Sequence, residues 1–288
     1  MKRYSKYFLL FVTMCLMSWP PPAHSTSYKF TTLNFPSAWS TQGKGINNSG
    51  KIVGSYWDSK GWHGFLWSGG VYTPLNVPGA SATYAYGISN LGFIVGYYTD
   101  GTGDHGFLLS GANYMSLDFP GASRTYAHGI NNIGQVVGSY YDGTGIHGFL
   151  WSGWNFTPLN VPGYSNGIND NSQIVGIYTN GTGTHGFLLN GSDYTTLNFP
   201  GVIYTNAYGI NNNGQIVGYY QNVGINHGFL LSGGVYTPLN VPGASYTEAY
   251  GINIFGQIAG SYHDGTGNHG FLATPIHPIV PSMYLLLF

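Results

Sequence analysis

Short apolar runs alternate with glycine-rich polar turns along most of the chain, and the runs recur in a fixed order. Residues 209–250 show one complete unit, GINNNGQIVGYYQNVGINHGFLLSGGVYTPLNVPGASYTEAY. Its strand-like runs are rich in valine, isoleucine, tyrosine, phenylalanine and threonine, the residues that suit a pleated surface. Turn sequences such as NNxG, DGTG and SGG separate these runs, and no stretch of the repeats has a helical period. The pattern therefore predicts an all-β protein.

Two markers define the repeat. The glycine that opens GIN or GIS precedes the histidine of the next HGF motif by 18 residues in every unit. The histidines follow one another at intervals of 42 residues, with one interval of 38, and they are His63, His105, His147, His185, His227 and His269. A fixed period of this length indicates a repeat architecture, so no single copy should be interpreted as an isolated motif.

Four short strands in about 42 residues predict a blade of a β-propeller. Runs such as FIVGYY are apolar without alternation, as expected for strands covered on both faces by neighbouring sheets. Residues 28–36, YKFTTLNFP, match the fourth strand of a unit, whereas the last unit lacks its own fourth strand. We therefore predict a six-bladed propeller that is closed by strand 28–36 completing the last blade. An open β-solenoid is the alternative, and it would leave unpaired edge strands.

The two ends of the chain differ from the repeats. Three basic residues within the first six positions precede a short apolar run and then PPPAHS, which is the layout of a secretory signal peptide. We expect a signal peptide at 1–25, the propeller at 26–273, and a proline-rich, apolar C-terminal tail at 274–288. The mature protein would be extracellular or periplasmic, without stable membrane insertion. An uncleaved N-terminal membrane anchor is the alternative.

The composition excludes several classes of function. Charged residues make up 6% of the chain and the formal net charge is −1, so there is no basic surface for nucleic acid. The single cysteine, Cys15, lies in the predicted signal peptide, which leaves no disulfide, thiolate metal site or cysteine nucleophile in the mature part. We expect a monomer without a cofactor.

The repeat resembles a known group, the bacterial extracellular repeat proteins called the HAF-repeat family. Their units read GINxxGQIVGxY, then HAF, then TxLxxPG, and the resemblance covers residues 28–273. All six copies here have His-Gly-Phe instead of His-Ala-Phe. The resemblance implies an exported repeat protein, and it implies no catalytic residues.

The repeated histidines are interpreted as structural. Each begins the third strand of its own blade, so the six cannot converge on one metal ion, and each has at most one carboxylate or amide five residues earlier. A catalytic zinc site usually has three protein ligands, and calcium favours clustered carboxylates. We therefore expect no metal and predict that each histidine bridges its hairpin loop by hydrogen bonds.

Catalytic motifs are also missing from the sequence. Glu248 is the only glutamate, and most aspartates lie in the repeated turns, so no glycosidase pair of carboxylates is visible. There is no nucleophile elbow, P-loop or HExxH motif. We predict that the protein is not an enzyme. A hydrolase with residues meeting at the channel mouth is the less favoured alternative.

The differences between repeats indicate a candidate ligand site. The first unit carries the tentative set Trp39, Trp57, Asp58, Lys60 and Trp62, on the face where the loop between the second and third strands emerges. Exposed aromatic residues with polar neighbours commonly mark binding surfaces. We therefore predict a binding or surface-interaction module whose partner is a glycan or another component of the cell envelope. The alternative is a purely structural repeat domain, in which these tryptophans only cover the closure.

Overall fold

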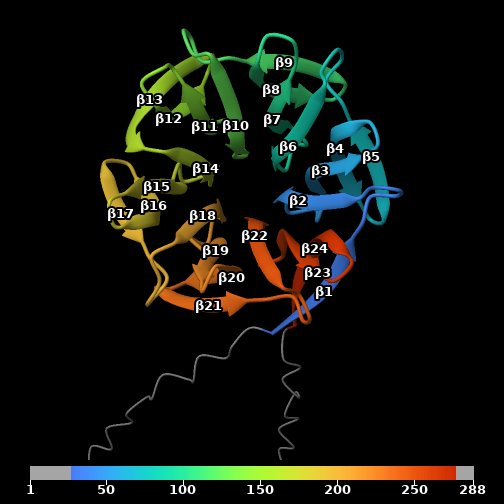
Figure 1. Ribbon diagram of the computed structural model, residues 1–288. Coiled ribbons are helices and arrows are strands. Elements are labelled where there is room, and N and C mark those ends of the chain that lie inside the picture. The colour runs from blue at the N-terminus through green and yellow to red at the C-terminus, as the bar shows by residue number, and fades with distance from the viewer. Residues whose placement is uncertain (1–26, 277–288) are drawn as a thin grey trace, which may run out of the picture.

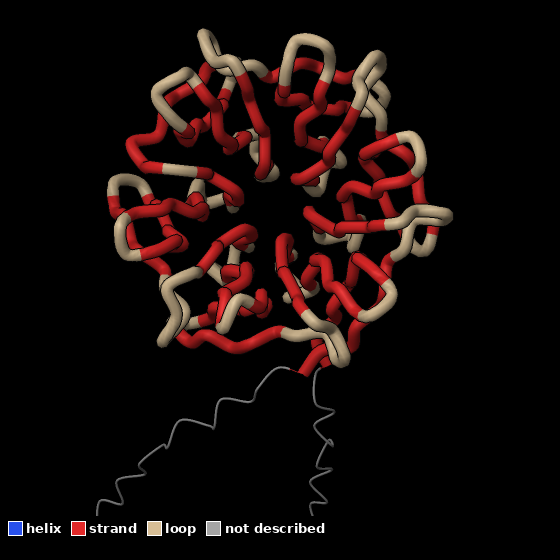
Figure 2. Tube along the Cα trace, viewed as in Figure 1, coloured by secondary structure: helices blue, strands red, loops and turns tan. Residues whose placement is uncertain are grey.

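The computed structural model describes residues 27–276, which form a ring of β-sheets around a central opening (Figure 1). Every regular element in this range is a strand, and short loops and turns join the strands (Figure 2). Within 27–276 the chain has no helix that is long and apolar enough to cross a membrane. The predicted signal peptide at 1–25, and the predicted tail from 277 onward, lie outside the described residues.

Four of the sheets contain four antiparallel strands each, in chain order. The first comprises β6 (Ala82–Ile88), β7 (Ile94–Thr99), β8 (Asp104–Ser110) and β9 (Asn113–Leu117). The second comprises β10 (Arg124–Ile130), β11 (Val136–Tyr141), β12 (Ile146–Ser152) and β13 (Asn155–Pro162). The third comprises β14 (Tyr164–Ile168), β15 (Ile174–Asn180), β16 (Gly183–Asn190) and β17 (Asp193–Leu197). The fourth comprises β18 (Thr205–Ile210), β19 (Ile216–Asn222), β20 (Ile225–Ser232) and β21 (Val235–Leu239).

The remaining eight strands form one connected sheet that contains both ends of the described chain. One part comprises β2 (Ser40–Ile46), β3 (Ile52–Asp58), β4 (Gly61–Ser68) and β5 (Val71–Leu75). The other part comprises β22 (Tyr246–Ile252), β23 (Ile258–Asp264), β24 (Gly267–Ile276) and β1 (Ser27–Leu33). The prediction of an all-β propeller with four-stranded blades is confirmed.

Strand β1 pairs with β24 in antiparallel register along its whole length, from Ser27 opposite Ile276 to Leu33 opposite Gly270. A single parallel pair, Ser40 opposite Asn268, connects β24 to β2. Strand β24 continues to Ile276, past the predicted propeller boundary at 273, and residues 274–276 pair with the start of β1. The strand predicted at 28–36 ends at Leu33.

The core lies between neighbouring sheets. The phenylalanine of each HGF motif is fully buried, and these residues are Phe65, Phe107, Phe149, Phe187, Phe229 and Phe271. Phe65 of β4 packs in one cluster with Leu33 of β1 and Ala259 of β23, so the first and last units share a core. Burial of one such side chain contributes about 1.5–3 kcal/mol.

In the five units that have a GIN motif, its asparagine joins the turn to the next sheet. Asn211 is an example: its Oδ1 accepts the backbone N–H groups of Asn213 and Gln215, both at 3.0 Å. Its Nδ2 donates to the backbone carbonyl of Asn253 in the next unit at 2.9 Å. Asn253 Nδ2 donates in turn to the carbonyl of Asn47 at 3.1 Å, across 206 residues of sequence. These asparagines therefore stabilise both their own turns and the contacts between sheets.

Candidate functional site

The innermost strand of every unit contains an irregularity at the same place. In β2, Gly43 pairs with Gly54 and Gly45 pairs with Val53, so the residue between them, Lys44, has no opposite partner. Such a β-bulge re-aims the side chain of the extra residue and is common beside functional sites. The residues at the equivalent bulges of the six units are Lys44, Tyr86, His128, Asn166, Tyr208 and Tyr250.

The glycine after each bulge allows the inner strands to approach closely. A Cβ atom at Gly251 would lie only 2.6 Å from the carbonyl oxygen of Lys44 on the neighbouring inner strand. The glycine of the GIN motif is therefore required by packing around the central opening. Close approach of the strands brings the six bulge side chains together in one layer.

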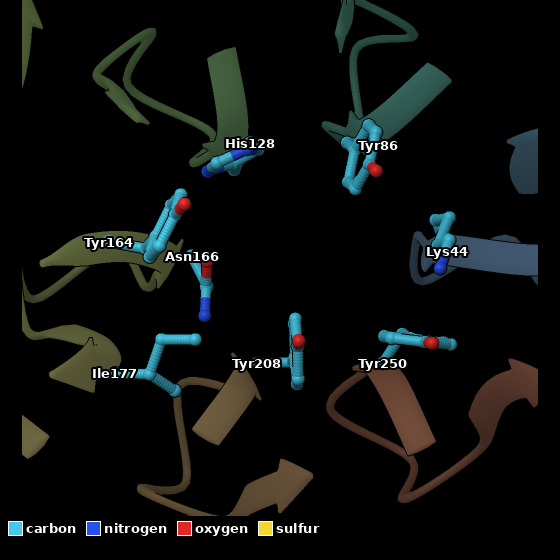
Figure 3. A pocket seen from close by; sticks show the side chains of 8 residues that line it. All are labelled: Lys44, Tyr86, His128, Tyr164, Asn166, Ile177, Tyr208 and Tyr250. Carbon is cyan, nitrogen blue, oxygen red and sulfur yellow. The ribbon is translucent and has the colours of Figure 1, made fainter. Parts of the chain in front are cut away.

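The bulge side chains surround a cavity of about 200 Å³ in the central opening (Figure 3). We call this the central cavity, and its lining is Lys44, Tyr86, His128, Tyr164, Asn166, Ile177, Tyr208 and Tyr250. A second cavity of about 300 Å³ shares three of these residues. We call it the side cavity, and its lining is Tyr86, Tyr97, Arg124, Tyr126, His128, Tyr141, Ile146 and Tyr164. The two cavities therefore adjoin each other, and both combine aromatic rings with a few polar groups.

Lys44 places a positive charge in the wall of the central cavity. Its side chain is only 8% exposed. The Nζ atom lies 3.4 Å from the ring centroid of Tyr250 and 5.7 Å from that of Tyr86, so the ammonium group is stabilised by cation–π contact. Burial lowers the pKa of Lys44 from 10.5 to about 8, and the nearby negative charge of Glu248 acts in the opposite direction.

Glu248 on β22 is the only glutamate of the chain, and it is the carboxylate whose charge acts on Lys44. Its Oε1 accepts a hydrogen bond from Asn226 Nδ2 at 2.6 Å. Its Oε2 accepts hydrogen bonds from the hydroxyl of Tyr250 and, at 3.4 Å, from the hydroxyl of Ser261. The carboxylate is therefore held by neutral donors from three strands.

His128 is a half-buried, neutral member of the same wall. Its Nδ1 lies 3.2 Å from the carbonyl oxygen of Ser165, which can only accept, so Nδ1 carries the proton and Nε2 is an acceptor. Burial lowers the pKa of His128 to about 4, against the effect of the hydrogen bond to Ser165. Burial also raises the pKa of Tyr86 to about 12 and the pKa values of Tyr208 and Tyr250 well above 10. Around neutral pH the lysine is therefore the charged member of the bulge layer.

The predicted tryptophans do lie together on one surface. The ring centroids of Trp39 and Trp57 are 4.8 Å apart in an edge-to-face arrangement, and those of Trp57 and Trp62 are 6.3 Å apart and nearly parallel. Trp39 is 60% exposed and Trp57 is 42% exposed. This surface belongs to the hairpin of β3 and β4 and to the loop that enters β2.

The row of aromatic rings continues into the next unit. Trp62 lies 5.7 Å from Tyr84 of β6, and Tyr84 stacks on Tyr97 of β7 at 4.6 Å. Tyr97 also lines the side cavity. We call this row the aromatic track, and it comprises Trp39, Trp57, Trp62, Tyr84 and Tyr97. It connects the exposed tryptophans with the cavities of the central opening.

Asp58 and Lys60 form the turn beside the tryptophans. The carboxylate Oδ1 of Asp58 accepts the backbone N–H of Lys60 at 2.8 Å and lies 3.4 Å from Nε2 of His63. Asp58 is therefore engaged in holding the hairpin turn. Its predicted contact with a ligand remains a prediction, as does that of the Lys60 ammonium group.

The repeated histidines occupy equivalent places at the start of the third strand of each unit. At His185, Nδ1 lies 2.7 Å from Asn198 Oδ1, and Nε2 lies 2.9 Å from Thr182 Oγ1. The ring thus bridges the hairpin loop to the segment after the fourth strand. His147 makes the loop contact with Thr144 Oγ1 at 3.0 Å. No group of three or more histidine, cysteine, aspartate or glutamate side chains within 27–276 is arranged to hold a metal ion.

Reasoning from sequence missed the bulge layer and the cavities. A signal was present in the residue before the GIN glycine, which changes among lysine, tyrosine, histidine and asparagine while its neighbours in the motif stay nearly constant. A column that varies chemically inside a repeated motif is the place where otherwise similar units differ in function. Regular strand alternation, however, gives no indication that this residue points into the central opening.

No protein-family model matches the chain, and no curated protein matches its sequence. The fold is similar to that of several solved structures. One is a catalytically inactive virginiamycin B lyase from Staphylococcus aureus with quinupristin, at 12% identity and a TM-score of 0.52, covering 85% of this chain and 99% of that one. Another is SapL1 lectin in complex with alpha methyl fucoside, at 12% identity and a TM-score of 0.54, covering 85% and 98%. The fungal lectin from Aleuria aurantia, a six-bladed β-propeller, has 12% identity and a TM-score of 0.50, covering 88% and 100%.

These similarities place the chain in the class of β-propellers. At 12% identity they show the fold alone, and the lyase and the lectins share it. A functional conclusion must therefore come from the side chains of this protein.

Proposed function

We propose that the protein is a secreted, non-enzymatic glycan-binding propeller whose ligand lies along the aromatic track. The observation that carries this proposal is the unbroken row of rings from Trp39 to Tyr97, which begins on an exposed surface and ends at a cavity. Aromatic faces stack on the apolar faces of sugars, and nearby polar groups orient the hydroxyls. A row of rings at intervals of 4.6–6.3 Å suits an extended oligosaccharide better than a single small molecule.

The track occurs at one place in the ring of sheets. Trp57 and Trp62 lie opposite each other on β3 and β4, and none of the other five units has a tryptophan at either position. The pairs at the equivalent positions are Thr99 and Asp104, Tyr141 and Ile146, Thr179 and Thr184, Gln221 and Asn226, and His263 and Asn268. One main site therefore fits the side chains better than six equal sites.

The architecture that supports this site is, in our proposal, a closed six-bladed ring. The eight-stranded sheet then counts as two blades, and β1 supplies the fourth strand of the last one. Three contacts support closure: the full pairing of β1 with β24, the core shared by Phe65 and Leu33, and the hydrogen bond from Asn253 to Asn47. The repeat motifs support membership of the HAF-repeat family, and with it an extracellular or periplasmic location.

A glycan array probed with the protein lacking residues 1–25 tests the proposal. The double variant Trp57→Ala with Trp62→Ala should lose most or all of the binding signal on the glycans that the wild type binds. Its melting curve should stay cooperative. Trp154→Ala is the matched control, because Trp154 is 75% exposed but lies in the turn between β12 and β13, at the other end of the strands. It should bind like the wild type.

Other results would support the alternatives. If the wild type binds no glycan, the tryptophans cover the closure of the ring and the domain is a structural repeat. If bound oligosaccharides are shortened during incubation, the central opening holds a catalytic site and the protein is an enzyme. A double variant that loses only part of the binding stoichiometry in calorimetry would indicate several weak sites in different blades.

A further inference from the structure

The ammonium group of Lys44 lies in the wall of the central cavity and is not held by a carboxylate of residues 27–276. None of the ion pairs within residues 27–276 includes Lys44. Its Nζ atom lies 3.4 Å from the ring centroid of Tyr250, in a cation–π contact. A ring face compensates part of the lost hydration, but it does not replace three N–H···O hydrogen bonds. The lysine lines the central cavity, and Figure 3 shows its side chain at the edge of that opening.

Glu248, the carboxylate whose charge acts on Lys44, is engaged elsewhere. Glu248 already accepts hydrogen bonds from Asn226, Tyr250 and Ser261. Its negative charge favours the protonated lysine. The ion pairs among residues 27–276 do not include one between Glu248 and Lys44. The charge of Lys44 is thus maintained while its N–H groups remain available to the cavity.

Two other polar side chains of the wall, His128 and Asn166, offer acceptors to the cavity. His128 uses Nδ1–H for the Ser165 carbonyl, which leaves the lone pair of Nε2. Asn166 uses Nδ2 for the Ala207 carbonyl at 2.9 Å, which leaves its Oδ1. Acceptors of this kind suit hydroxyl groups, whereas they repel a fully ionised inorganic anion such as phosphate.

We propose that the central cavity binds an acidic sugar, a uronic acid unit whose carboxylate is bound by Lys44 while its hydroxyls donate to His128 and Asn166. This inference rests on the proposed glycan-binding function and names its ligand class. The rings of Tyr86, Tyr208 and Tyr250 enclose the sugar. The side cavity, which shares Tyr86 and His128 with the central cavity and meets the aromatic track at Tyr97, holds the preceding units of the oligosaccharide. Arg124 provides a second positive charge along that path.

Isothermal titration calorimetry with paired ligands tests this inference. The probes are short oligouronates, each compared with the neutral oligosaccharide obtained by reducing its carboxyl groups. The wild type should bind the acidic member of a pair about ten- to a hundredfold more tightly, which is the size expected for one charge-assisted hydrogen-bonded contact. Lys44→Met, which keeps the length of the side chain, should abolish this preference and leave the affinity for the neutral member within about twofold.

Two further variants control for indirect effects. Lys51→Met removes an exposed lysine from the turn after β2 and should leave the preference unchanged. Lys44→Arg keeps the positive charge and should retain part of the preference. If Lys44→Met does not give a cooperative melt, the comparison of Lys44→Arg with the wild type on both ligands replaces it.

The outcomes separate this inference from the proposed function. A wild type that binds both members of every pair equally overturns the acidic ligand but leaves glycan binding intact. A wild type that prefers the acidic member, with Lys44→Met and Lys44→Arg showing the same preference, places the carboxylate elsewhere and overturns the role of Lys44. Failure to bind any glycan overturns both.

Discussion

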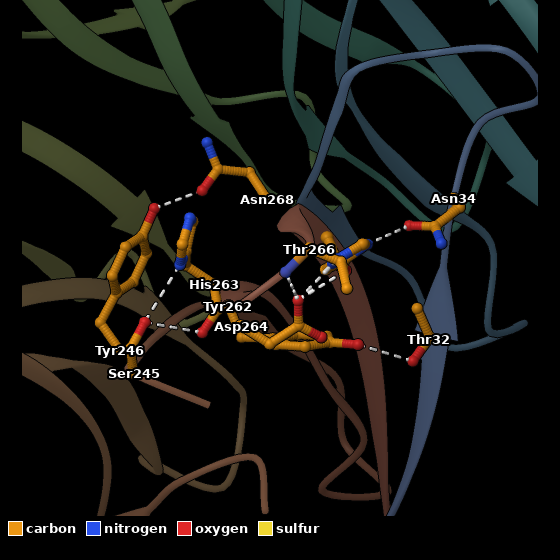
Figure 4. Close-up of polar contacts among 10 residues, drawn as sticks. Thr32, Asn34, Ser245, Tyr246, Tyr262, His263, Asp264, Thr266 and Asn268 are labelled. Atoms are coloured by element: carbon orange, nitrogen blue, oxygen red, sulfur yellow. Dashed lines mark hydrogen bonds and ion pairs between the residues drawn. The ribbon is translucent and has the colours of Figure 1, made fainter. Parts of the chain in front are cut away.

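His269 Nδ1 lies 2.8 Å from the side-chain oxygen of Asn34, although 235 residues separate them in the chain. In the sheet of β14–β17 the same contact joins His185 and Asn198, which are only 13 residues apart. Asn34 therefore occupies, at the last sheet, the position that ordinarily follows a unit's own fourth strand. Thr32 adds a second contact, a hydrogen bond of 2.8 Å between its hydroxyl and that of Tyr262 (Figure 4).

This equivalence gives a prediction for ring closure. Asn34→Ala and Asn198→Ala should lower the free energy of unfolding by similar amounts, about 1 kcal/mol each, because each removes the same histidine contact. Deletion of residues 26–36 should lower the melting temperature sharply, since it exposes the edge of β24 and part of the shared core. Chemical denaturation checks both. A measurable cost for Asn198→Ala with none for Asn34→Ala would contradict closure by β1.

The histidines give a second prediction. His185→Ala should cost about 1–3 kcal/mol of stability, because it leaves Asn198 and Thr182 without their partner. His227→Ala should cost less, since this ring stacks on Tyr220 at 5.3 Å but has no side-chain hydrogen bond among the described residues. Metal content measured by mass spectrometry should be the same in both variants and the wild type. Loss of a stoichiometric metal from either variant would show that the histidine is a ligand.

Lys44 gives a third prediction, which concerns stability rather than binding. The pKa of its buried amine is about 8, below the ordinary 10.5, so holding the charge destabilises the folded state below pH 8. Lys44→Met should therefore be more stable than the wild type at pH 7, by up to about 3 kcal/mol. The wild type regains stability as pH rises from about 8 to 10.5, so the advantage of the variant should shrink over that range. Urea denaturation at pH 7 and pH 10 measures the difference, and an advantage that does not change with pH would contradict the assignment.

His128 gives a fourth prediction, on the acidic side. Its pKa is about 4 in the folded protein and 6.5 ordinarily, so the unfolded chain binds the additional proton between these values. The stability associated with His128 should thus be complete above about pH 6.5 and should fall, by on the order of 1–3 kcal/mol, as pH drops to about 4. His128→Tyr is the matched variant, because tyrosine occupies the equivalent bulge at residues 86, 208 and 250. Its stability should fall less over the same interval, and an identical fall would assign the loss to other groups.

Much of the architecture can be predicted from local sequence. Turn sequences such as DGTG and NNxG place the hairpins, and apolar runs without alternation indicate strands that are covered on both faces. The match between residues 28–36 and the missing fourth strand of the last unit predicts the pairing of β1 with β24, apart from the strand ends. These features depend on interactions within one repeat, or on a period that is visible in the sequence.

The candidate site depends on contacts between repeats, and only the tertiary structure decided it. The sequence by itself predicted that Trp57 and Trp62, which flank one turn, lie on one surface with Trp39, and the three rings do lie next to one another. It gave no reason to connect Trp62 with Tyr84, or to bring Lys44 and Tyr250 to within 3.4 Å across 206 residues. Both contacts arise where neighbouring sheets meet, and the second also requires the bulges that turn one residue of each inner strand toward the central opening. A bulge breaks the two-residue alternation from which strand faces are predicted. The sequence pattern therefore cannot predict which way the six bulge side chains point, and these are the side chains that define the central cavity.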